Sequence, residues 1–561
     1  MNPDRLLALF EPISEAPDAI SRLRRFILDL AVRGKLEEQD PEDEPAEELI
    51  RLISTEKARL AQAGKIKRLK PLPPLTEEEV LEELPKGWSL SRLGCLIDLI
   101  SGQHLQPSEY SENPADGLPY ITGPSDFSPG GICVTRYSLV RKAVAFKGQL
   151  LLTVKGSGVG KTAICDIQEV AISRQLMALT AIGWNDHYLA LITHRLAVKL
   201  QSEARSLIPG ISREDVENFV LPLPPLAEQH RIVAKVNELM ALCDRLEAAR
   251  QQREQYRDRL VAASLQRLNQ PSDDPDTFRS DARFALQVLP SLTSTPAQIK
   301  QLRQTILNLA VRGKLVEQDP EDEPADEQLA RIIEAKILLD RRAPTAKKKR
   351  SELSDESLDF PFPARWTSAP LSDLVTVLNG RAYKQSELLD TGTPVLRVGN
   401  LFTSNKWYYS DLELDDDKYC DDGDLIFAWS ASFGPFIWNG GRAIYHYHIW
   451  KLPLHSPEDL SRDYLYLYLL NKTDEIKASG HGISMVHMTK EKMERLEVPL
   501  PPLAEQHRIV AKVNELMALC DQLEQQLSQG EQSRRRLLEA VLQEALAGRL
   551  PERPEQSDAA L

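Results

Sequence analysis

The 561-residue sequence predicts an α/β protein that also contains long α-helices, with two α/β domains separated by repeated helical segments. Three observations lead to this fold class. Helical segments of nearly the same sequence occur twice in the chain, and their apolar residues follow the seven-residue spacing of a coiled coil. The segments between them contain short apolar runs of the kind that form strands.

Two sequences recur and divide the chain into halves. Repeat A, "LAVRGKLEEQDPEDEPA" at 30–46, matches 309–325 with one difference, Glu37 against Val316. Repeat B, "PLPPLAEQHRIVAKVNELMALCD", is identical at 222–244 and 499–521, and a partial echo of repeat A closes the chain at 537–550. We therefore expect two globular domains at 88–221 and 366–498, with helical segments and linkers at 1–87, 222–365 and 499–561.

Repeat B predicts a long helix in each half. Ile232, Val236, Leu239, Cys243 and Leu246 follow a 4-3-4-3 spacing, which is the apolar stripe of a coiled coil, and the second copy repeats it. A helix of about 40 residues would be roughly 60 Å long. Cys243 and Cys520 lie on this stripe, so we expect buried structural thiols.

Repeat A predicts the end of another helix, with a glycine cap at Gly34 and at Gly313. An acidic turn and a further helix should follow. The Lys/Pro-rich stretches 64–79 and 343–356 are typical of exposed linkers. We interpret the basic run 347–350 as solvated, with contact to a phosphate backbone as the alternative.

The two globular domains share a skeleton but little sequence. Each opens with Pro-x-x-Trp, ending at Trp88 and Trp366, and a glycine follows fourteen residues later, at Gly102 and Gly380. Each also contains a glycine-led apolar run and a Gly-Ile-Ser close to its end. Short β-branched and aromatic runs ("LLLTV", "LIFAW") followed by helical stretches such as "SRDYLYLYLLNKTDEI" predict α/β folds.

The stretch "TVKGSGVGKTAICD" at 153–166 looks at first like a phosphate-binding loop. That motif reads G-x-x-x-x-G-K-[ST], and the position where its first glycine belongs is Lys155. The second domain has Gly434-Pro435-Phe436 where the first has Gly160-Lys161-Thr162. The sequence therefore predicts a hairpin turn, without nucleotide binding.

The identity of the two copies of repeat B includes polar residues that core packing does not explain. We expect these residues on the surface, where they would meet the same partner twice. The predicted partner-binding residues are Glu228, Gln229, His230, Leu239, Glu505, Gln506, His507 and Leu516. Recombination that copied one repeat onto the other is the alternative, and the two explanations are compatible.

With these repeats and two dissimilar middles, nearly the whole chain resembles the specificity (S) subunit of type I restriction–modification systems. The resemblance implies two target-recognition domains, each reading one half of a split DNA sequence. It also implies that the repeated helices form an antiparallel coiled-coil spacer with pseudo-two-fold symmetry. The chain itself would be a non-catalytic subunit.

The resemblance further implies partners and places the cofactors in them. Two DNA adenine methyltransferase (M) subunits would dock on the repeated helices, and up to two motor/endonuclease (R) subunits would join. S-adenosylmethionine, ATP and Mg²⁺ would belong to those partners, and this chain would hold no cofactor or metal.

Charge supports a need for partners on independent grounds. The formal net charge is −14, residues 88–220 are neutral by count, and residues 366–498 carry −6. Binding to double-stranded DNA requires local positive charge, which another subunit would have to supply.

Base and phosphate contacts favour basic, amide and hydroxyl side chains on loops. We expect such contacts from the following residues in the first domain and then the second: Gln103, His104, Lys155, Ser157, Lys161, Arg174, Gln175, Arg213; Arg381, Tyr383, Lys384, Arg397, Asn400, Asn405, Lys406, Ser430, Ser432 and His487.

Other features argue against competing chemistry. His446 and His448 are expected on one strand face as packing residues, and Asp421, Asp422 and Asp424 as an exposed acidic turn, because neither group completes a metal site. The six cysteines have no C-x-x-C spacing, which argues against zinc and disulfides. A nucleotide-hydrolysing or nuclease enzyme and a coiled-coil scaffold remain the rival hypotheses.

The bulk composition describes a soluble globular protein, with 42% hydrophobic and 27% charged residues. No apolar run approaches the roughly 20 residues that span a bilayer, and the N-terminus lacks the layout of a signal peptide. We expect a cytoplasmic protein without membrane contact.

Overall fold

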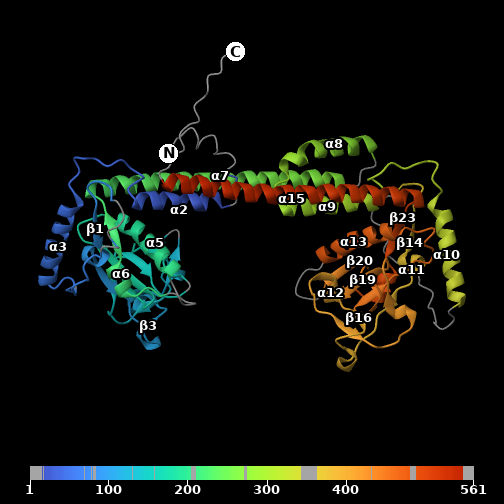
Figure 1. Ribbon diagram of the computed structural model, residues 1–561, viewed down its shortest axis with the longest axis horizontal. Coiled ribbons are helices and arrows are strands. Elements are labelled where there is room, and N and C mark those ends of the chain that lie inside the picture. The colour runs from blue at the N-terminus through green and yellow to red at the C-terminus, as the bar shows by residue number, and fades with distance from the viewer. Residues whose placement is uncertain are drawn as a thin grey trace, which may run out of the picture. The chain divides into compact units, whose positions relative to one another are not determined.

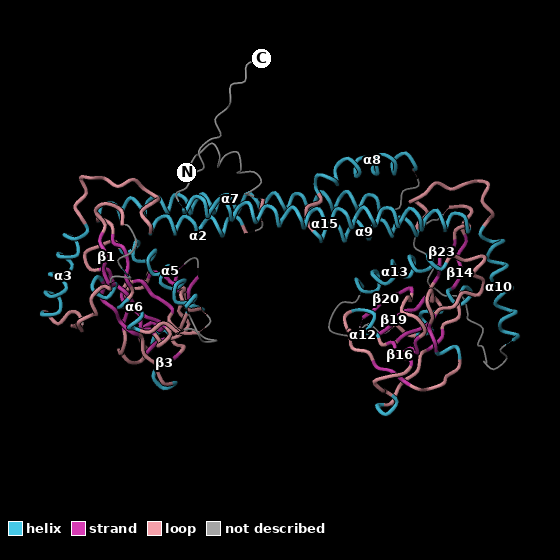
Figure 2. Tube along the Cα trace, in the orientation of Figure 1, coloured by secondary structure: helices cyan, strands magenta, loops and turns pink. Residues whose placement is uncertain are grey.

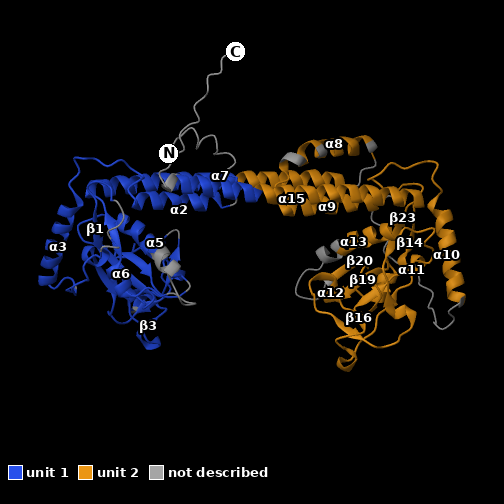
Figure 3. Ribbon diagram, viewed as in Figure 1, with its two compact units in different colours: residues 1–251, 531–561 blue, residues 252–530 orange. Residues whose placement is uncertain are grey.

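The computed structural model describes residues 15–16, 18–68, 70–76, 79, 84–128, 131–156, 158–203, 210–270, 274–342, 363–430, 432–479 and 488–547. The chain divides into two compact units (Figure 3). Unit 1 comprises residues 1–251 and 531–561, and unit 2 comprises residues 252–530. Each unit contains one globular domain together with helical segments, so the two halves that the repeats predict are also structural halves.

Besides the end of α15 (Leu503–Ala547), the described part of unit 1 contains three helices outside its globular domain, and the repeats cover the end of the first, the turn after it and the start of the third. The three helices are α2 (Ala19–Val32), α3 (Ala46–Gln62) and the first part of α7 (Leu226–Asn269). Helix α2 lies along α7 (Figure 1), and its Ile27 shares one core with Ile232 and Val236 of α7. The predicted cap at Gly34 is confirmed: φ is 63° there, and the Lys35 amide donates back to the Leu30 carbonyl at 3.0 Å.

The described part of the first globular domain contains two main sheets and the helices α4 (Leu93–Leu96), α5 (Asp186–Glu203) and α6 (Arg213–Asn218). One sheet has the order β10-β9-β12-β2 and is antiparallel; the other has the order β3-β7-β4-β11-β8 and contains one parallel pair, β4 with β11. The strand bounds, in sheet order, are Thr162–Ile164, Leu150–Thr153, Leu176–Ala181, Ile97–Ser101; Tyr110–Ser111, Tyr137–Ser138, Leu118–Ile121, Glu169–Ile172 and Val144–Phe146.

The second globular domain repeats this plan with a different sequence. Its sheets have the orders β15-β22-β19-β20 and β17-β16-β21-β18, and the parallel pair is β16 with β21. The strand bounds are Leu378–Asn379, Ile449–Lys451, Leu425–Ser430, Ser432–Ile437; Tyr408–Ser410, Thr393–Leu396, Ala443–Tyr445 and Tyr419–Cys420. Helix α13 (Arg462–Ser479), where the sequence predicts a helical stretch, packs on β20. In Figure 2 the strands of each domain are magenta.

A short ribbon closes each domain at its base. Strand β1 (Ser89–Arg92) enters the first domain and pairs antiparallel with β13 (Val220–Leu223), which leaves it. Strands β14 (Thr367–Pro370) and β23 (Glu497–Leu500) do the same in the second. Entry and exit therefore lie side by side in both domains, immediately before a long helix begins.

The long helices are confirmed. Helix α7 has 44 residues and α15 (Leu503–Ala547) has 45, so each is about 66 Å long at 1.5 Å per residue. Cys243 and Cys520 are buried on the apolar stripe, as expected. Within the described residues, no helix combines the length and the hydropathy that crossing a membrane requires.

Unit 2 contains a helix that the spacing of the repeats does not indicate. Helix α8 (Pro275–Leu292) precedes α9 (Pro296–Val311) and α10 (Ala325–Arg342). An aspartate followed by a proline is a sequence signal for the start of a helix. In the structure Asp274 caps α8 by accepting hydrogen bonds from the amides of residues 276 and 277, and Pro275 occupies the first turn. The basic run 347–350 lies outside the described residues.

Candidate nucleic-acid interface

The glycine-rich stretch of the first domain forms a hairpin. Strands β9 and β10 pair antiparallel, the Gly160 amide donates to the Thr153 carbonyl at 2.9 Å, and the Thr153 amide donates to the Lys161 carbonyl at 2.8 Å. Two residues thus oppose one, which is a β-bulge with Gly160 at φ 89°. A phosphate-binding loop leads into a helix N-terminus. Here the loop leads into a strand, so the hairpin prediction is confirmed.

The second hairpin has no such bulge. The ladder of β19 and β20 runs without interruption to Ser430 opposite Ser432, and Gly434 faces Ala428. Gly434 therefore takes the place of Lys161 in the ladder. The sequence alignment that matched Gly434 with Gly160 is wrong by one residue, because the bulge adds a residue to the first hairpin.

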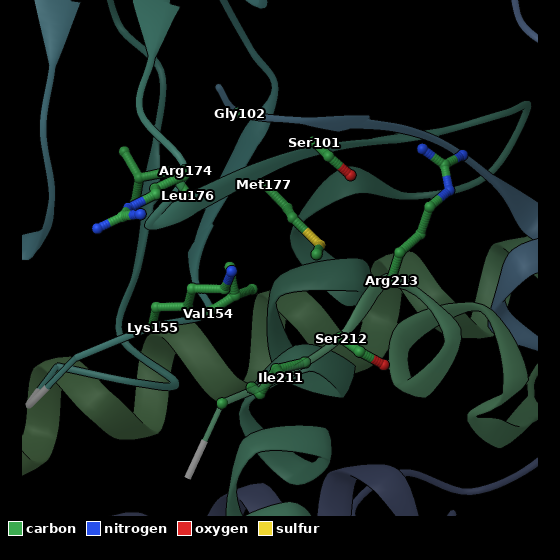
Figure 4. Close-up of a pocket in the computed structure, with 11 residues that line it drawn as sticks. Ser101, Gly102, Val154, Lys155, Arg174, Leu176, Met177, Ile211, Ser212 and Arg213 are labelled. Carbon is green, nitrogen blue, oxygen red and sulfur yellow. The ribbon is translucent and has the colours of Figure 1, made fainter. Parts of the chain in front are cut away.

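A pocket of about 400 Å³ lies beside the first hairpin (Figure 4). It collects three of the basic residues that the sequence singled out, although they are far apart in the chain. Its lining residues are Ser101, Gly102, Val154, Lys155, Arg174, Leu176, Met177, Gly210, Ile211, Ser212 and Arg213.

The charged groups of this pocket differ in how they are held. Lys155 and Arg174 are exposed. Arg213 is partly exposed, donates to Glu217 at 2.7 Å and reaches the Leu99 carbonyl at 3.2 Å. Basic groups around an apolar floor suit a ligand with negative charge and flat apolar surface, which is the chemistry of a nucleic acid.

The remaining predicted contacts of the first domain lie on its surface or outside the described chain. The side chains of Gln103, His104, Lys161 and Gln175 are exposed. Ser157 lies outside the described residues.

Both opening glycines are explained by a close backbone approach. A Cβ atom on Gly102 would lie 2.0 Å from the Ser173 carbonyl oxygen, and one on Gly380 would lie 2.4 Å from the His446 carbonyl oxygen. Only glycine allows these loops to pass so near the neighbouring strand.

In the second domain, two basic residues flank an aromatic ring that the sequence did not single out. The Arg397 guanidinium lies 5.2 Å and the Lys406 ammonium 5.1 Å from the centre of the Tyr408 ring. Both basic residues are exposed, and Lys406 contributes most to a lowered pKa of the Tyr408 hydroxyl. In the sequence, the signal for this aromatic contact was a tyrosine two residues after a lysine.

Asn400, in the short helix α12 (Val398–Phe402), holds together the segment between Arg397 and Lys406. The side-chain oxygen of Asn400 accepts from the Arg397 backbone amide at 3.2 Å, and its side-chain nitrogen donates to the Lys406 backbone carbonyl at 2.9 Å. The expectation that Asn400 is available to a base is therefore corrected: it shapes the loop that carries Arg397 and Lys406. Asn405 is exposed.

The next group in this domain is also partly used inside it. Arg381 pairs with Glu387 at 2.8 Å, and the Tyr383 hydroxyl donates to the Tyr445 carbonyl at 3.3 Å. Burial raises the pKa of Tyr383. Lys384 is exposed.

Two expectations at the second hairpin change. Ser430 is 8% exposed within the ladder, so its expected place at an accessible tip is corrected. Ser432 lies on β20, but its side chain is not among those described. His487 lies outside the described residues.

His446 and His448 do not share a strand face as expected: β21 ends at Tyr445, His446 forms a single bridge with Arg381, and His448 lies in the turn before β22. Their ring centres are 4.9 Å apart. The pKa of His446 is lowered to about 4, mainly by burial and secondly by the charge of His448. The described residues include no group of three potential metal ligands.

Two of the three aspartates of the acidic turn, Asp421 and Asp424, pair with basic residues inside the domain. Arg442 pairs with Asp416 at 2.9 Å and with Asp421 at 3.0 Å, while Lys451 pairs with Asp424 at 2.6 Å. These partners agree with a structural turn before β19 rather than a nuclease site.

The polar residues of repeat B require a correction. Glu228 and Gln229 are 1% and 0% exposed, and Glu505 and Gln506 are likewise 1% and 0% exposed. They were expected on the surface, but they bind other parts of their own unit. Burial raises the pKa of Glu228 and of Glu505.

The rest of repeat B divides into half-buried and exposed residues. Leu239 and Leu516 are half-buried and pack against the cores of their units. The side chains that are exposed in both copies include His230 with His507, Asn237 with Asn514, and Leu242 with Leu519. These exposed pairs are the part of repeat B that faces solvent twice.

Comparison with known proteins gives consistent matches. Residues 85–254 and 363–530 match the family model described as the type I restriction modification DNA specificity domain. The chain is 30% identical to the specificity subunit of the Escherichia coli type I restriction enzyme EcoAI over 578 aligned positions, which cover 94% of each chain. It is 29% identical to that of EcoEI, from the same species, with the same coverage.

One solved structure is similar along most of the chain. The crystal structure of the HsdS subunit from Thermoanaerobacter tengcongensis matches with a TM-score of 0.42 and 20% identity, covering 84% of this chain and all of that one. Each segment matched by the family model contains one globular domain and the start of the long helix that follows it.

Proposed function

Because the chain belongs to the family of type I restriction–modification DNA specificity proteins, we propose that it reads an asymmetric, two-part DNA sequence, one part with each globular domain. It is the DNA-recognition subunit of such a system, and subunits of this kind are non-catalytic. The two globular domains are its recognition domains. Their shared topology and different loops carry the proposal, because a common scaffold with different surface chemistry reads different bases.

In recognition domain 1, we assign DNA contact to the pocket beside the hairpin. Lys155, Arg174 and Arg213 supply positive charge there, and Gln103, His104, Lys161 and Gln175 are exposed for hydrogen bonds. Lysine and arginine bind phosphate, while amide and arginine groups also read base edges.

In recognition domain 2, the segment from Arg397 to Tyr408, which also carries Asn405 and Lys406, is the main candidate. A tyrosine beside two exposed basic groups offers an aromatic surface next to positive charge. Lys384 and Arg381 form a second basic group on the same domain.

The partners of a type I specificity subunit are the methyltransferase and restriction subunits. We assign methyltransferase docking to the exposed residues of repeat B, which include His230, Asn237 and Leu242 with their counterparts His507, Asn514 and Leu519. Two identical exposed surfaces support two copies of one partner, and up to two restriction subunits would join them.

The same scheme assigns cofactors and location. S-adenosylmethionine, ATP and Mg²⁺ would be held by the partner subunits, and the complex would work in the cytoplasm, where its DNA lies. Residues 88–220 are neutral and residues 366–498 carry −6 by count, so partner subunits would add the positive charge that DNA binding needs.

The test is to express the chain together with its methyltransferase subunit and to map methylated bases by single-molecule sequencing. We expect one asymmetric target in two parts, separated by a nonspecific spacer of fixed length, with methylated adenines on opposite strands. An undivided or palindromic target would contradict the proposal.

A further inference from the structure

A buried carboxylate on helix α7 joins three separate segments of unit 1. Glu228 accepts a hydrogen bond from the indole nitrogen of Trp88 at 2.9 Å and another from the side-chain amide of Gln39 at 3.2 Å. Trp88 stands where recognition domain 1 begins, and Gln39 lies in the turn between α2 and α3.

Unit 2 builds the same contact from its own residues. Glu505 on α15 accepts from Trp366 at 3.0 Å and from Gln318 at 2.9 Å. Both tryptophans are buried, at 6% and 5% exposure. The two domains share little other sequence, so this agreement marks a feature that both halves need.

An ion pair beside each carboxylate ties the long helix to the same turn. Arg231 binds both carboxylate oxygens of Asp43, at 3.2 and 2.7 Å, and Arg508 binds both of Asp322, at 3.2 and 2.6 Å. A bidentate ion pair fixes the orientation of the two side chains as well as the distance between them.

The neighbouring glutamine fastens each domain at a second point. The side-chain oxygen of Gln229 accepts from the Asn185 amide at 3.1 Å, and that of Gln506 accepts from the Ser461 amide at 2.9 Å. These amides lie immediately before helices α5 and α13. Each recognition domain therefore contacts its long helix both near its first strand and near one of its later helices.

These contacts matter because the chain itself connects domain and helix only at the closing ribbon. Entry and exit strands are adjacent there, so the covalent connection alone would allow the domain to swing about that point. The Trp–Glu–Gln contact fixes the ribbon end of the domain to the turn between the two preceding helices, and the Gln–amide contact adds a second attachment point away from the ribbon. A buried carboxylate that loses a donor is costly, which favours one orientation over its neighbours.

We propose that Trp88 with Glu228, and Trp366 with Glu505, are positioning residues that set the orientation of each recognition domain on its long helix, and so the spacer length accepted between the two DNA half-sites. This inference rests on the proposed function. It also accounts for the identity of the buried residues of repeat B, because two domains of different sequence contact the same side chains.

The test uses the full chain assembled with its methyltransferase subunit. Methylation is measured at the mapped target and at targets whose spacer is one base pair shorter or longer, for wild type, Trp366→Phe and Glu505→Gln. Trp438→Phe is the matched control, because Trp438 is also buried in recognition domain 2 and donates one indole hydrogen bond, but to Gly441 within the domain.

We expect Trp366→Phe and Glu505→Gln to lower the preference for the native spacer by about tenfold, the loss typical for a hydrogen bond to a charged group. The bases of both half-sites should stay the same, and Trp438→Phe should keep the native preference. Trp88→Phe should act like Trp366→Phe.

Equal loss of methylation at all three spacers would show a merely structural role and overturn the proposal, as would a change in the recognised bases. Thermal unfolding of each variant identifies those that lose fold. Absence of any two-part target for wild type would overturn the proposed function first, and a wild-type target with an unchanged spacer preference in the variants would overturn this inference alone.

Discussion

Residues two positions apart in repeat B have opposite roles. Glu228 is buried in its own unit, whereas His230 is exposed. The sequence carried the signal for this difference, because Glu228 precedes Ile232 by four residues and so continues the buried stripe of α7. Polarity alone suggested a surface position for Glu228, whereas its helical spacing from Ile232 indicates the buried position that the structure shows.

The basic residues around Tyr408 give the first prediction. Replacing Arg397 or Lys406 by alanine should weaken DNA binding by the assembled complex and lower the slope of log affinity against log salt by about 1 for each lost phosphate contact. Binding titrations at several salt concentrations measure this slope.

Arg442→Ala is the control for that experiment. Arg442 also lies over a tyrosine ring, 4.2 Å from the centre of Tyr419, but it pairs with Asp416 and Asp421 inside the domain. Its salt slope should match wild type. Equal slopes for all three variants would contradict the assignment of this loop to DNA.

The buried carboxylates give a prediction about pH. Burial raises the pKa of Glu228 and Glu505 above the ordinary 4.5, so the folded chain holds these protons to higher pH than the unfolded chain does. Their contribution to stability is therefore complete below pH 4.5 and is lost as pH rises through the raised folded pKa.

Comparison with Glu228→Gln/Glu505→Gln isolates this effect. The unfolding free energy of wild type minus that of the variant should fall as pH rises above 4.5 and then level off, as measured by denaturant unfolding. Glu238→Gln/Glu515→Gln changes exposed carboxylates on the same helices and serves as the control. A difference that rises with pH would contradict the raised pKa.

At the scale of elements, those with a strong local pattern were predictable. The end of α2 at Gly34, the strand β9, the helix α13 and both long helices agree with the sequence. Strand pairing was not predictable, because the partners of β9 come from distant segments and their order depends on tertiary packing.

The close backbone approaches give a prediction at this scale. Gly102→Ala and Gly380→Ala should each lower the unfolding free energy by about 2–3 kcal/mol, because the added methyl group would overlap a carbonyl oxygen of the adjacent strand. Gly530→Ala in α15 meets nothing within 4 Å and should raise stability by up to about 1 kcal/mol. Unchanged melting of Gly102→Ala would show that the loop does not pass so close.

At the scale of the whole chain, the internal repeat predicted the two halves, the long helices and the family. The DNA-contacting residues were less predictable, because the loops of the two domains differ and neither copy helps to interpret the other. Lys155, Arg174 and Arg213 do gather at one pocket, but Asn400 and Ser430 have structural places that only the folded loops reveal.

The central claim is that each recognition domain reads its own half-site and that both domains bind their long helices through the same contacts. Replacing residues 366–498 by a second copy of residues 88–221 tests it most directly, since the Trp88 and Asn185 contacts should form equally well with Glu505 and Gln506. Sequencing of methylated DNA from cells that express this chain with its methyltransferase should show a symmetric two-part target built from the first half-site alone. A target that keeps the second half-site, or one in which both halves change together, would contradict the claim.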